Sequence, residues 1–495
     1  MSLQTTTLRD VAVIDIGSNS VRLVVYRLEG RAVWTLFNEK VLAGLGRELA
    51  ATKRLAPAGV KLAMQALRRF AAVLEGVQPD AVLIAATAAV REAEDGQIFC
   101  DRVAAETGLK IRVLSGAEEA RYAALGVIAG SPAADGVSAD MGGASLELTR
   151  IDRGAPGEGV TLPLGPFSLV DPAGFDADKL RKRIDKRLKP VAGAFAQPVL
   201  YSVGGAWRSL AQFHMSLNAY PLRIVHQYAM SAADAREAAA LLARQSRGSL
   251  EAIEGVSKKR AETLPYAALV LEALIERLGI ERVEFSAWGV REGLLFEWLG
   301  SQLTSMDPLI SGCAALGARQ GVAPGLAGSL QGWLTRIMDS QPGVFGPERD
   351  ALMTAAACNL ADIGARLHPD HRVELTFDQV LRAPVPGQNH AERAYLATAV
   401  NARYGGGANT PEPATIERLL TPQARQRARV LGLAIRLACD LSGRSPQLLA
   451  NASAKVKDGA LTLTAASGFA DVLLGEQTRR RAKALAEAME LRLDV

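Results

Sequence analysis

The sequence lacks the features of membrane-spanning, exported and zinc-binding proteins. No stretch approaches the roughly 18 uncharged apolar residues of a membrane span, so we expect no membrane partner. The first ten residues, Met1 to Asp10, lack the apolar core of an export signal, and we expect a cytoplasmic protein. The four cysteines include no Cys-x-x-Cys pair, which predicts buried free thiols rather than a zinc or redox site.

Aromatic residues are also scarce, at 5% of the 495 residues. That is few for a protein that stacks nucleic-acid bases, and no zinc-finger or RNA-recognition motif is present, so we expect no nucleic-acid partner. The net charge of +5 is compatible with a polyanionic ligand but does not require one. With 49% hydrophobic and 22% charged residues the chain is globular, and its length predicts several domains.

One motif, Asp-x-Gly-x-x-Ser-x-x-Leu, occurs twice, beginning at Asp15 and again 125 residues later at Asp140. In each copy an apolar run leads into the motif and an alternating run leads out of it, which predicts a strand, a turn and a second strand. A repeat of this kind suggests two similar lobes whose turns face each other across a cleft.

The glycines and acids of these turns suggest phosphate and metal binding. Glycines with positive φ expose successive backbone N–H groups, which can hold phosphate oxygens. Asp140 and Glu147 flank the turn that contains Gly142 and Gly143, and together they could share one Mg²⁺, which prefers oxygen ligands. The alternative is a pair of ordinary hairpins, in which Asp and Gly serve the turns alone.

The element pattern predicts an α/β fold in which one arrangement occurs twice. Each lobe begins with three meandering strands and continues with alternating helices and strands, as in the actin-like architecture. For the first lobe we expect strands at 11–16, 20–27, 32–41, 81–87 and 110–114, with helices at 57–74, 96–107 and from Ser115. For the second we expect strands at 136–140, 144–151, 158–164, 199–203 and 282–286, with helices at 177–189, 231–244, 258–278 and 290–299.

Beyond about Met306 the sequence changes to helix formers interrupted by Gly and Pro. Helices are predicted at 327–340, 347–366, 391–403 and 422–442, followed by a strand at 459–464 and a helix at 476–491. The predicted domains are therefore two lobes, a helical domain and a small α+β tail, with bounds 1–130, 131–303, 304–445 and 446–495.

Three further groups could take part in chemistry. Arg91 follows a buried strand, where a guanidinium could clamp phosphate oxygens, although a surface arginine at a helix start fits equally well. Gly204 and Gly205 follow a strand and begin a helix, whose N-terminus can bind an anion. Glu118 and Glu119 lie in the first turn of a helix, so one can cap it while the other faces the cleft as a base; alternatively both only favour the helix dipole.

Five motifs together resemble the exopolyphosphatase and guanosine pentaphosphate phosphatase (Ppx/GppA) family over about residues 9–300. They are Asp15-Ile-Gly-Ser-Asn-Ser20, Ala86-Thr-Ala-Ala-Val-Arg-Glu92, Ser115-Gly-Ala-Glu-Glu-Ala-Arg121, Asp140-Met-Gly-Gly-Ala-Ser-Leu-Glu147 and Trp288-Gly-Val-Arg-Glu-Gly293. The resemblance implies Mg²⁺-dependent hydrolysis of the terminal phosphate of inorganic polyphosphate by a homodimer. It implies catalytic roles for Glu119, the base, and Arg91, and metal ligation by Asp140, Glu147 and Asp15. Phosphate would be held by Arg91 and by Asn19, Ser20, Gly142, Gly143, Ala144, Ser145, Gly204 and Gly205.

The sequence departs from the family pattern in two places. The third glycine of the second turn is replaced by Ala144, which predicts a negative φ there or a reshaped turn. The helical domain resembles His-Asp metal phosphohydrolases, yet the His-Asp doublet reads Ala361-Asp362, so we expect no working second metal centre.

Four functions remain open. An exopolyphosphatase is the first choice, and a guanosine pentaphosphate 5′-phosphatase, which would also bind guanosine tetraphosphate, is the same-class alternative. A kinase or chaperone-like ATPase shares the fold but lacks a recognisable nucleoside pocket here. A non-catalytic regulator that binds polyphosphate would make no chemical use of the acids in the predicted cleft. The basic helix 177–189 and Arg425, Arg427 and Arg429 are candidates for gripping a long polyanion.

Overall fold

The computed structural model describes residues 8–171, 174–252, 261–318 and 325–495. The chain divides into two compact units between Met306 and Asp307. The first unit holds both predicted lobes and the second holds the helical region with its tail. No helix in the described part of the chain is long and apolar enough to cross a membrane. Most of the N-terminal stretch expected to lack an export signal lies outside the described residues.

The first lobe is built on a five-stranded sheet in the order β3-β2-β1-β4-β5. The first three strands form the predicted antiparallel meander, and β4 returns parallel to β1. Its strands are β1 (Leu8–Ile16), β2 (Val21–Glu29), β3 (Ala32–Val41), β4 (Ala81–Ala86) and β5 (Arg112–Val113). Its helices are α1 (Leu49–Thr52), α2 (Pro57–Val77), α3 (Ala88–Glu92), α4 (Gly96–Thr107) and α5 (Gly116–Gly130).

The second lobe repeats this arrangement and adds one edge strand, in the order β10-β11-β9-β6-β7-β8. Strands β6, β7 and β8 form the meander, and β9 returns parallel to β6. Its strands are β6 (Gly136–Met141), β7 (Leu146–Asp152), β8 (Ala155–Leu162), β9 (Val199–Val203), β10 (Tyr228–Ser231) and β11 (Arg282–Phe285). Its helices are α6 (Pro166–Leu169), α7 (Ala177–Leu188), the 3-10 helix at Ala192–Phe195, α8 (Gly205–Leu217), α9 (Ala232–Arg244), α10 (Arg247–Ala252), α11 (Leu264–Leu278), α12 (Val290–Leu299) and α13 (Ser301–Thr304).

The duplicated α/β fold, predicted from the repeated motif, is therefore confirmed as two actin-like lobes. The edge strand β10 was not predicted. Part of the helix predicted at 258–278 lies outside the described residues, and α11 accounts for the remainder.

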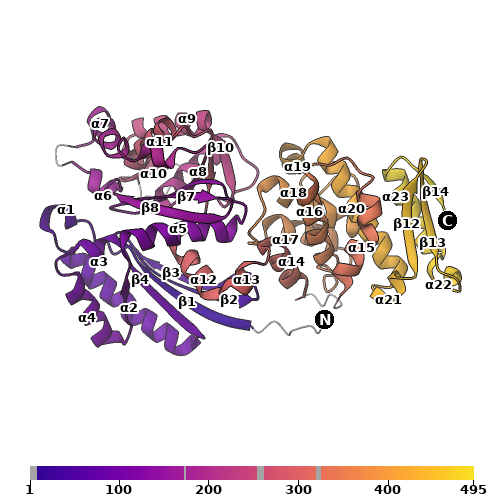
Figure 1. Ribbon diagram of the computed structural model, residues 1–495. Helices are drawn as coiled ribbons and strands as arrows, with labels where there is room; N and C mark the ends of the chain where they lie inside the picture. The colour runs from indigo at the N-terminus through magenta and orange to yellow at the C-terminus, as the bar shows by residue number, and fades with distance from the viewer. Residues whose placement is uncertain (1–7, 172–173, 253–260, 319–324) are drawn as a thin grey trace. The chain divides into compact units, whose positions relative to one another are not determined.

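Helices α5 and α12 lie between the two sheets and hold the lobes together (Figure 1). Each helix carries a glycine where the other crosses it. A Cβ on Gly126 would lie 2.1 Å from the carbonyl oxygen of Gly289, and one on Gly293 would lie 1.9 Å from that of Tyr122. Only glycine permits this approach, and the crossing fixes the N-terminal ends of both helices beside the turns of the two hairpins.

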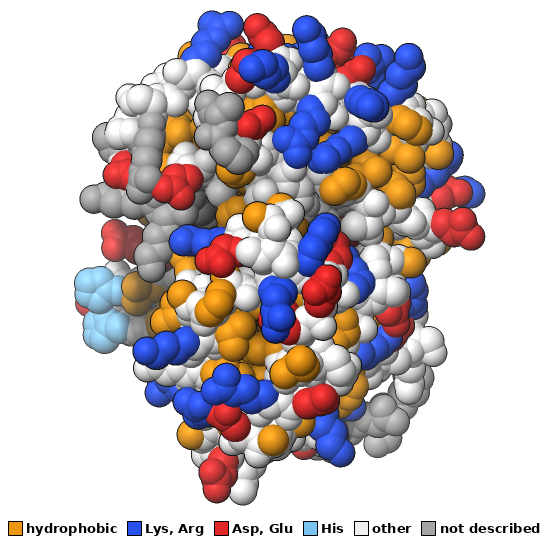
Figure 2. All heavy atoms as spheres, turned by 90° about the vertical axis from the view of Figure 1, so that its left-hand side faces the viewer, with side chains coloured by type: hydrophobic (Ala, Val, Ile, Leu, Met, Phe, Trp, Pro, Cys, Tyr) orange, Lys and Arg blue, Asp and Glu red, His pale blue; other side chains and the backbone are white. Residues whose placement is uncertain are grey.

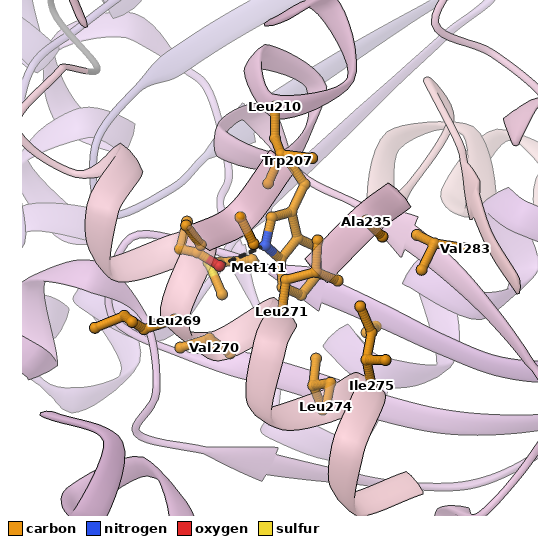
Figure 3. Close-up of a cluster of buried hydrophobic side chains, with 14 of the residues drawn as sticks. Met141, Trp207, Leu210, Ala235, Leu269, Val270, Leu271, Leu274, Ile275 and Val283 are labelled. Carbon is orange, nitrogen blue, oxygen red and sulfur yellow. Dashed lines mark hydrogen bonds between the residues drawn. The ribbon is translucent and has the colours of Figure 1, made fainter. Parts of the chain in front are cut away.

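The apolar core of the second lobe fixes the position of the start of α8. Figure 3 shows Trp207 of α8 among apolar side chains of α11, including Leu271 and Leu274. The indole N–H of Trp207 donates to the carbonyl oxygen of Ala267 at 2.9 Å, so the buried ring leaves no donor unsatisfied. The turn at Gly204 and Gly205 that precedes Trp207 is therefore rigidly supported.

The second unit, residues 307–495, is helical and ends in a three-stranded sheet of order β12-β13-β14. The predicted α+β tail is confirmed, but β12 and β14 were missed. The helical elements are α14 (Pro308–Ala318), α15 (Leu326–Met338), α16 (Pro347–Asn359), α17 (Arg372–Arg382), α18 (His390–Arg403), α19 (Pro413–Leu419), α20 (Pro422–Ser442) and α21 (Pro446–Leu449). The tail comprises β12 (Ala452–Lys457), β13 (Ala460–Ala465), α22 (Ala470–Leu473), α23 (Glu476–Ala488) and β14 (Arg492–Asp494).

The helix predicted at 347–366 ends at Asn359, so its last turns were predicted wrongly. The chain turns there because Gly364 packs against Tyr404, whose hydroxyl accepts the Gly364 N–H at 2.8 Å. Asp362, from the altered His-Asp doublet, is buried and forms ion pairs of 3.3 Å with Arg403 and with Arg444. Two guanidinium groups thus balance the charge of this buried carboxylate.

Candidate active site

The two duplicated turns meet and form the walls of a cleft of about 180 Å³ within the first unit. A Cβ added to Gly143, in the second turn, would lie 3.1 Å from the Cβ of Ser18 in the first. The cleft is lined by residues of both turns, by the starts of α3, α5, α8 and α12, and by β3. The predicted meeting of the hairpins is therefore confirmed.

The glycines of the turns do not adopt left-handed backbone, and only Gly143 is tightly packed, since a Cβ there would lie 3.1 Å from the ring of Phe167. None of Gly17, Gly142 and Gly143 lies in the positive-φ region, so the predicted nest of positive-φ glycines is wrong. Each turn is closed by an ordinary hairpin bond, from the Gly17 N–H to the Ser20 oxygen at 2.9 Å and from the Gly142 N–H to the Ser145 oxygen at 3.0 Å. Since the second turn requires no positive φ, Ala144 fits at the position where the family usually has a third glycine.

Gly204 is the exception, with φ of +113°. A Cβ there would lie 2.5 Å from the carbonyl oxygen of Met141, so only glycine brings β9 into α8 beside the second hairpin. Gly205 begins α8, and both glycines line the cleft. The positive end of the helix dipole thus faces the cleft.

Two adjacent glutamates at the start of α5 have different surroundings, as predicted. Glu118 forms the capping box with Ser115 and pairs with Arg112 at 2.6 Å. The backbone N–H of Ser115 and the Arg112 guanidinium lower the pKa of Glu118 to about 2. Glu119 instead is buried, with 8% of its side chain exposed, and lines the cleft.

Glu119 is held by a hydrogen bond from Arg91, whose Nη1 lies 2.8 Å from Glu119 Oε2. Burial raises the pKa of Glu119, while the bonds from Arg91 and from the Thr87 hydroxyl oppose that rise. The same Nη1 also donates to the Leu114 carbonyl oxygen at 2.9 Å. Arg91 is not among the residues that line the cleft. The structure thus brings Arg91 to the predicted base, and not to the cleft wall where a phosphate clamp was expected.

Asp140 and Glu147 are paired across β6 and β7, as the predicted shared metal site requires. Burial and the nearby carboxylates of Glu119 and Asp15 raise the pKa of Asp140 to about 7. Burial, with Glu119 and Asp140 close by, also raises the pKa of Glu147 well above its usual range. Carboxylates this close together can all be ionised only if a positive charge lies among them.

These acids fit a hydrated Mg²⁺ better than a metal bound wholly by protein. Glu147 Oε1 is buried and has no hydrogen-bond partner, so it can take a ligand. No group of three His, Cys, Asp or Glu side chains in the described residues has the geometry of a metal site. Mg²⁺ commonly uses one or two carboxylates and keeps several waters, which suits the Asp140–Glu147 pair.

Asp15 was expected to join these ligands, but one of its oxygens is engaged elsewhere. Arg291 Nη1 lies 3.0 Å from Asp15 Oδ2. Arg291 of α12 therefore supplies the positive charge that balances Asp15. The assignment of Asp15 as a metal ligand stays a prediction.

Apart from Arg91, the predicted phosphate-binding residues are brought together with one exception, Ala144. Asn19, Ser20, Gly142, Gly143, Ser145, Gly204 and Gly205 all line the cleft. Ala144 is buried behind the turn, and its carbonyl oxygen accepts the Ser168 hydroxyl at 2.6 Å. Ala144 is therefore not a lining residue, because the turn points its side chain and carbonyl toward α6.

Sequence reasoning missed the cationic wall of the cleft. Arg22, Lys40, Arg208 and Arg291 line it together with Thr87. Arg208 and Arg291 lie within motifs that were recognised, three residues after Gly205 and two residues after Gly289, so their place in the first turns of helices was a usable signal. Lys40 gave none, because it reaches the cleft only through the register of β2 and β3, where it pairs with Arg22.

Positive side chains are also frequent on the outer face of this unit, mixed with acids (Figure 2). On α7 several are engaged: Arg183 donates to the Ser168 carbonyl oxygen at 2.7 Å and Arg181 pairs with Glu272 at 3.2 Å. Part of the basic helix predicted to grip a polyanion is thus used to hold the segment behind the cleft.

Comparison with known proteins supports the resemblance to the Ppx/GppA family that the five sequence motifs indicated. The profile of the Ppx/GppA phosphatase family matches residues 24–302, and that of the exopolyphosphatase C-terminal domain matches residues 310–495. Exopolyphosphatase 1 of Mycobacterium tuberculosis is 28% identical over 306 residues, covering 59% of this chain and 89% of the relative. Retrograde regulation protein 2 of Saccharomyces cerevisiae is 26% identical over 443 residues, covering 81% of this chain and 73% of the relative.

Solved structures show the same fold. An exopolyphosphatase from Cytophaga hutchinsonii superposes with a TM-score of 0.55 at 22% identity, covering 59% of this chain and 98% of that one. The Ppx/GppA family member of Aquifex aeolicus superposes with a TM-score of 0.52 at 24% identity, covering 58% of this chain and 97% of that one. The chain is a hydrolase of phosphoanhydride bonds and belongs to the Ppx/GppA phosphatase family.

Proposed function

We propose that the protein is an exopolyphosphatase, which releases terminal orthophosphate from inorganic polyphosphate with the help of Mg²⁺. The observation that carries the proposal is the position of Glu119, a buried carboxylate in a cleft that is also lined by Asp140 and by four cationic side chains. Glu147 does not line the cleft but is buried opposite Asp140 on β7. A linear polyanion with a reacting end needs these three features: a base for water, a metal for the terminal phosphate and cations for the remainder of the chain.

In the proposed reaction Glu119 accepts a proton from a water molecule, and the water oxygen attacks the terminal phosphorus. The bond between that phosphorus and the bridging oxygen breaks, and the shortened chain leaves with the electron pair on that oxygen. Mg²⁺ held by Asp140 and Glu147 would neutralise charge on the phosphate oxygens. Arg91 keeps Glu119 ionised and oriented through its 2.8 Å bond.

The size of the cleft favours an inorganic chain. Its volume of about 180 Å³ is below the roughly 300–1,000 Å³ of pockets that hold drug-sized ligands. Guanosine pentaphosphate ends in the same phosphoanhydride and remains the second candidate, with its guanosine outside the cleft. A kinase is less suitable, because Glu119 is buried and bonded to Arg91 and the Thr87 hydroxyl, a position that suits a water molecule better than a sugar hydroxyl.

A non-catalytic regulator remains the other-class alternative, and one relative bears a regulatory name. Against it stands the cost of keeping four carboxylates close together. A protein that only binds polyphosphate gains nothing from burying acids whose charge repels its ligand.

We further propose that the protein is cytoplasmic and forms a homodimer. Light scattering of the purified protein tests the dimer directly.

The decisive experiment measures orthophosphate release from long polyphosphate and from guanosine pentaphosphate, with and without Mg²⁺. Glu119→Gln keeps the shape and removes the base, so turnover should fall by about 10²–10⁴ while polyphosphate still binds. Glu118→Gln is the matched control, because Glu118 caps the same helix outside the cleft and its loss should leave turnover nearly unchanged. Parent-like turnover in Glu119→Gln would remove the residue from the reaction, and release from neither substrate would favour the regulator.

A further inference from the structure

The helical unit contains a second polar cavity, which lies outside the catalytic cleft. It has a volume of about 220 Å³ and lies between the end of α18, the loop 404–412, α19 and the start of α20. Its walls include both polar and apolar side chains, and every one belongs to the second unit. It is therefore a property of this unit alone.

Two polar groups of this cavity are buried without a partner. Asn401 is 1% exposed and Thr410 is 8% exposed, and neither Asn401 Oδ1 nor Thr410 Oγ1 has a hydrogen-bond partner. A buried polar atom left unsatisfied is costly, and native proteins rarely retain two in one small cavity without a ligand or water. The amide orientation of Asn401 is an assignment, so it can present N–H groups as readily as its oxygen.

The loop over Asn401 is built of glycines for close approach. A Cβ on Gly406 would lie 2.3 Å from Asn401 Oδ1, and Gly405 has φ of +91°. A side chain at position 406 would push the loop away from the Asn401 amide, and one at position 405 would meet the guanidinium of Arg436. The sequence thus preserves a tight cover over a polar group that the protein itself does not satisfy.

The cavity is positively charged. Arg425 and Arg429 lie one turn apart on α20 and both line it. Arg425 pairs with Glu417 at 3.2 Å, whereas Arg429 makes no ion pair with the described residues. The N-terminal end of α20, which begins at Pro422, adds its partial positive charge.

Arg427 lies between Arg425 and Arg429 in the sequence, and its contacts contradict the prediction that all three arginines bind a polyanion. It is buried, and its Nη1 donates to the carbonyl oxygens of Met338, Gln341 and Pro342. That prediction is wrong for Arg427, because an arginine used for packing cannot also bind a ligand. It leaves Arg425 and Arg429 as a pair directed at one cavity.

We propose that this cavity binds an inorganic phosphate group. Two guanidinium groups, a hydroxyl and an amide form a donor set that suits phosphate oxygens. The volume of about 220 Å³ is too small for a nucleotide by the usual range of ligand pockets, so the ligand is a small anion. The phosphate can be free orthophosphate or the end of a short inorganic polyphosphate. The site does not depend on the proposed hydrolysis.

The test is calorimetric titration of the full-length protein at constant ionic strength, with orthophosphate in one arm and tripolyphosphate in the other. The Glu119→Gln background prevents turnover. Phosphate sites in the catalytic cleft are the same in all proteins compared, so only differences between variants report on the cavity. Arg429→Gln and Thr410→Val should each weaken one binding site about 10- to 100-fold, as expected for lost charged hydrogen bonds.

Arg480→Gln is the matched control, because Arg480 is exposed on α23 and its loss removes the same charge outside the cavity. Thr410→Val should unfold at the same or a higher temperature than its parent in phosphate-free buffer, which separates lost binding from lost folding. The arm with the tighter binding identifies the source of the phosphate. Parent-like binding of both anions by either cavity variant overturns the proposal, and so does an equal loss in Arg480→Gln.

Discussion

Replacing Arg91 tests how the base is controlled. Arg91 donates to Glu119 Oε2 at 2.8 Å, and 20% of the Arg91 side chain and 8% of the Glu119 side chain are exposed. Burial raises the pKa of Glu119, and Arg91 is the main influence that lowers it. Without Arg91 the pKa of Glu119 rises further, so the base is protonated, and inactive, over a wider range of pH.

The size of the effect follows from the bond that is lost. A hydrogen bond to a charged group contributes about 1.5–3 kcal/mol. On the acid side of the pH profile, where Glu119 is mostly protonated, Arg91→Gln should therefore reduce kcat/KM about 10- to 150-fold. At alkaline pH the carboxylate ionises again and most of the activity should return.

The assay is the pH dependence of orthophosphate release under kcat/KM conditions, for the parent, Arg91→Gln and Arg91→Lys. The lysine variant keeps a positive charge near Glu119 but cannot also reach the Leu114 carbonyl oxygen in the same geometry, so its acid limb should lie between the other two. A uniform loss at every pH, with the acid limb unmoved, would refute this reasoning. It would show that Arg91 contacts the substrate, as the sequence alone suggested.

Three further outcomes follow from the geometry. Asp140→Asn and Glu147→Gln should each raise the Mg²⁺ concentration needed for half-maximal activity, and an unchanged Mg²⁺ curve would exclude that residue from the metal. In metal-free buffer the melting temperature should fall as the pH rises from about 4 to about 7. Burial raises the pKa of Asp140 from 3.8 to about 7, so over this range the unfolded chain releases a proton that the folded chain keeps, and stability falls. Asp140→Asn should flatten this dependence and Mg²⁺ should oppose it. Gly293→Ala should destabilise the protein by at least about 1–3 kcal/mol, since its Cβ would meet the Tyr122 oxygen at 1.9 Å, whereas Gly76→Ala, open within 4 Å, should be neutral or stabilising in denaturant melts.

The topology of the first unit could be predicted from the sequence because it depends on local patterns. A repeated strand, turn and strand, followed by helix and strand, specifies each sheet once the order of elements is known. The capping box at Ser115 was also readable, since Ser and Glu three residues apart define it. That motif in turn indicated which of the two adjacent glutamates is left for the cleft.

What could not be predicted depends on contacts between distant segments. Arg91 and Glu119 are 28 residues apart and belong to different helices, so their bond is visible only in the folded chain. The positive φ predicted for the turn glycines was wrong, and of these glycines only Gly143 is at a close approach; the sequence shows the same residue in either case. Arg427 shows a third limit: a basic residue on a helix looks the same whether it faces solvent or three carbonyl groups.

The two copies of the hairpin have diverged in charge at one equivalent position. Asp15 pairs across the strands with Arg22, and Asp140 pairs in the same register with Glu147. An identical backbone thus presents an acid and a cation in the first lobe but two acids in the second. Lys40 adds a further cation beside Arg22 in the first lobe, and Arg208 and Arg291 add cations at the starts of α8 and α12. For the proposed polyphosphate substrate, this difference between the two hairpins would favour one orientation of the chain. The reacting phosphate would lie near Asp140 and Glu147, the proposed Mg²⁺ ligands, and the next phosphates near Arg22 and Lys40.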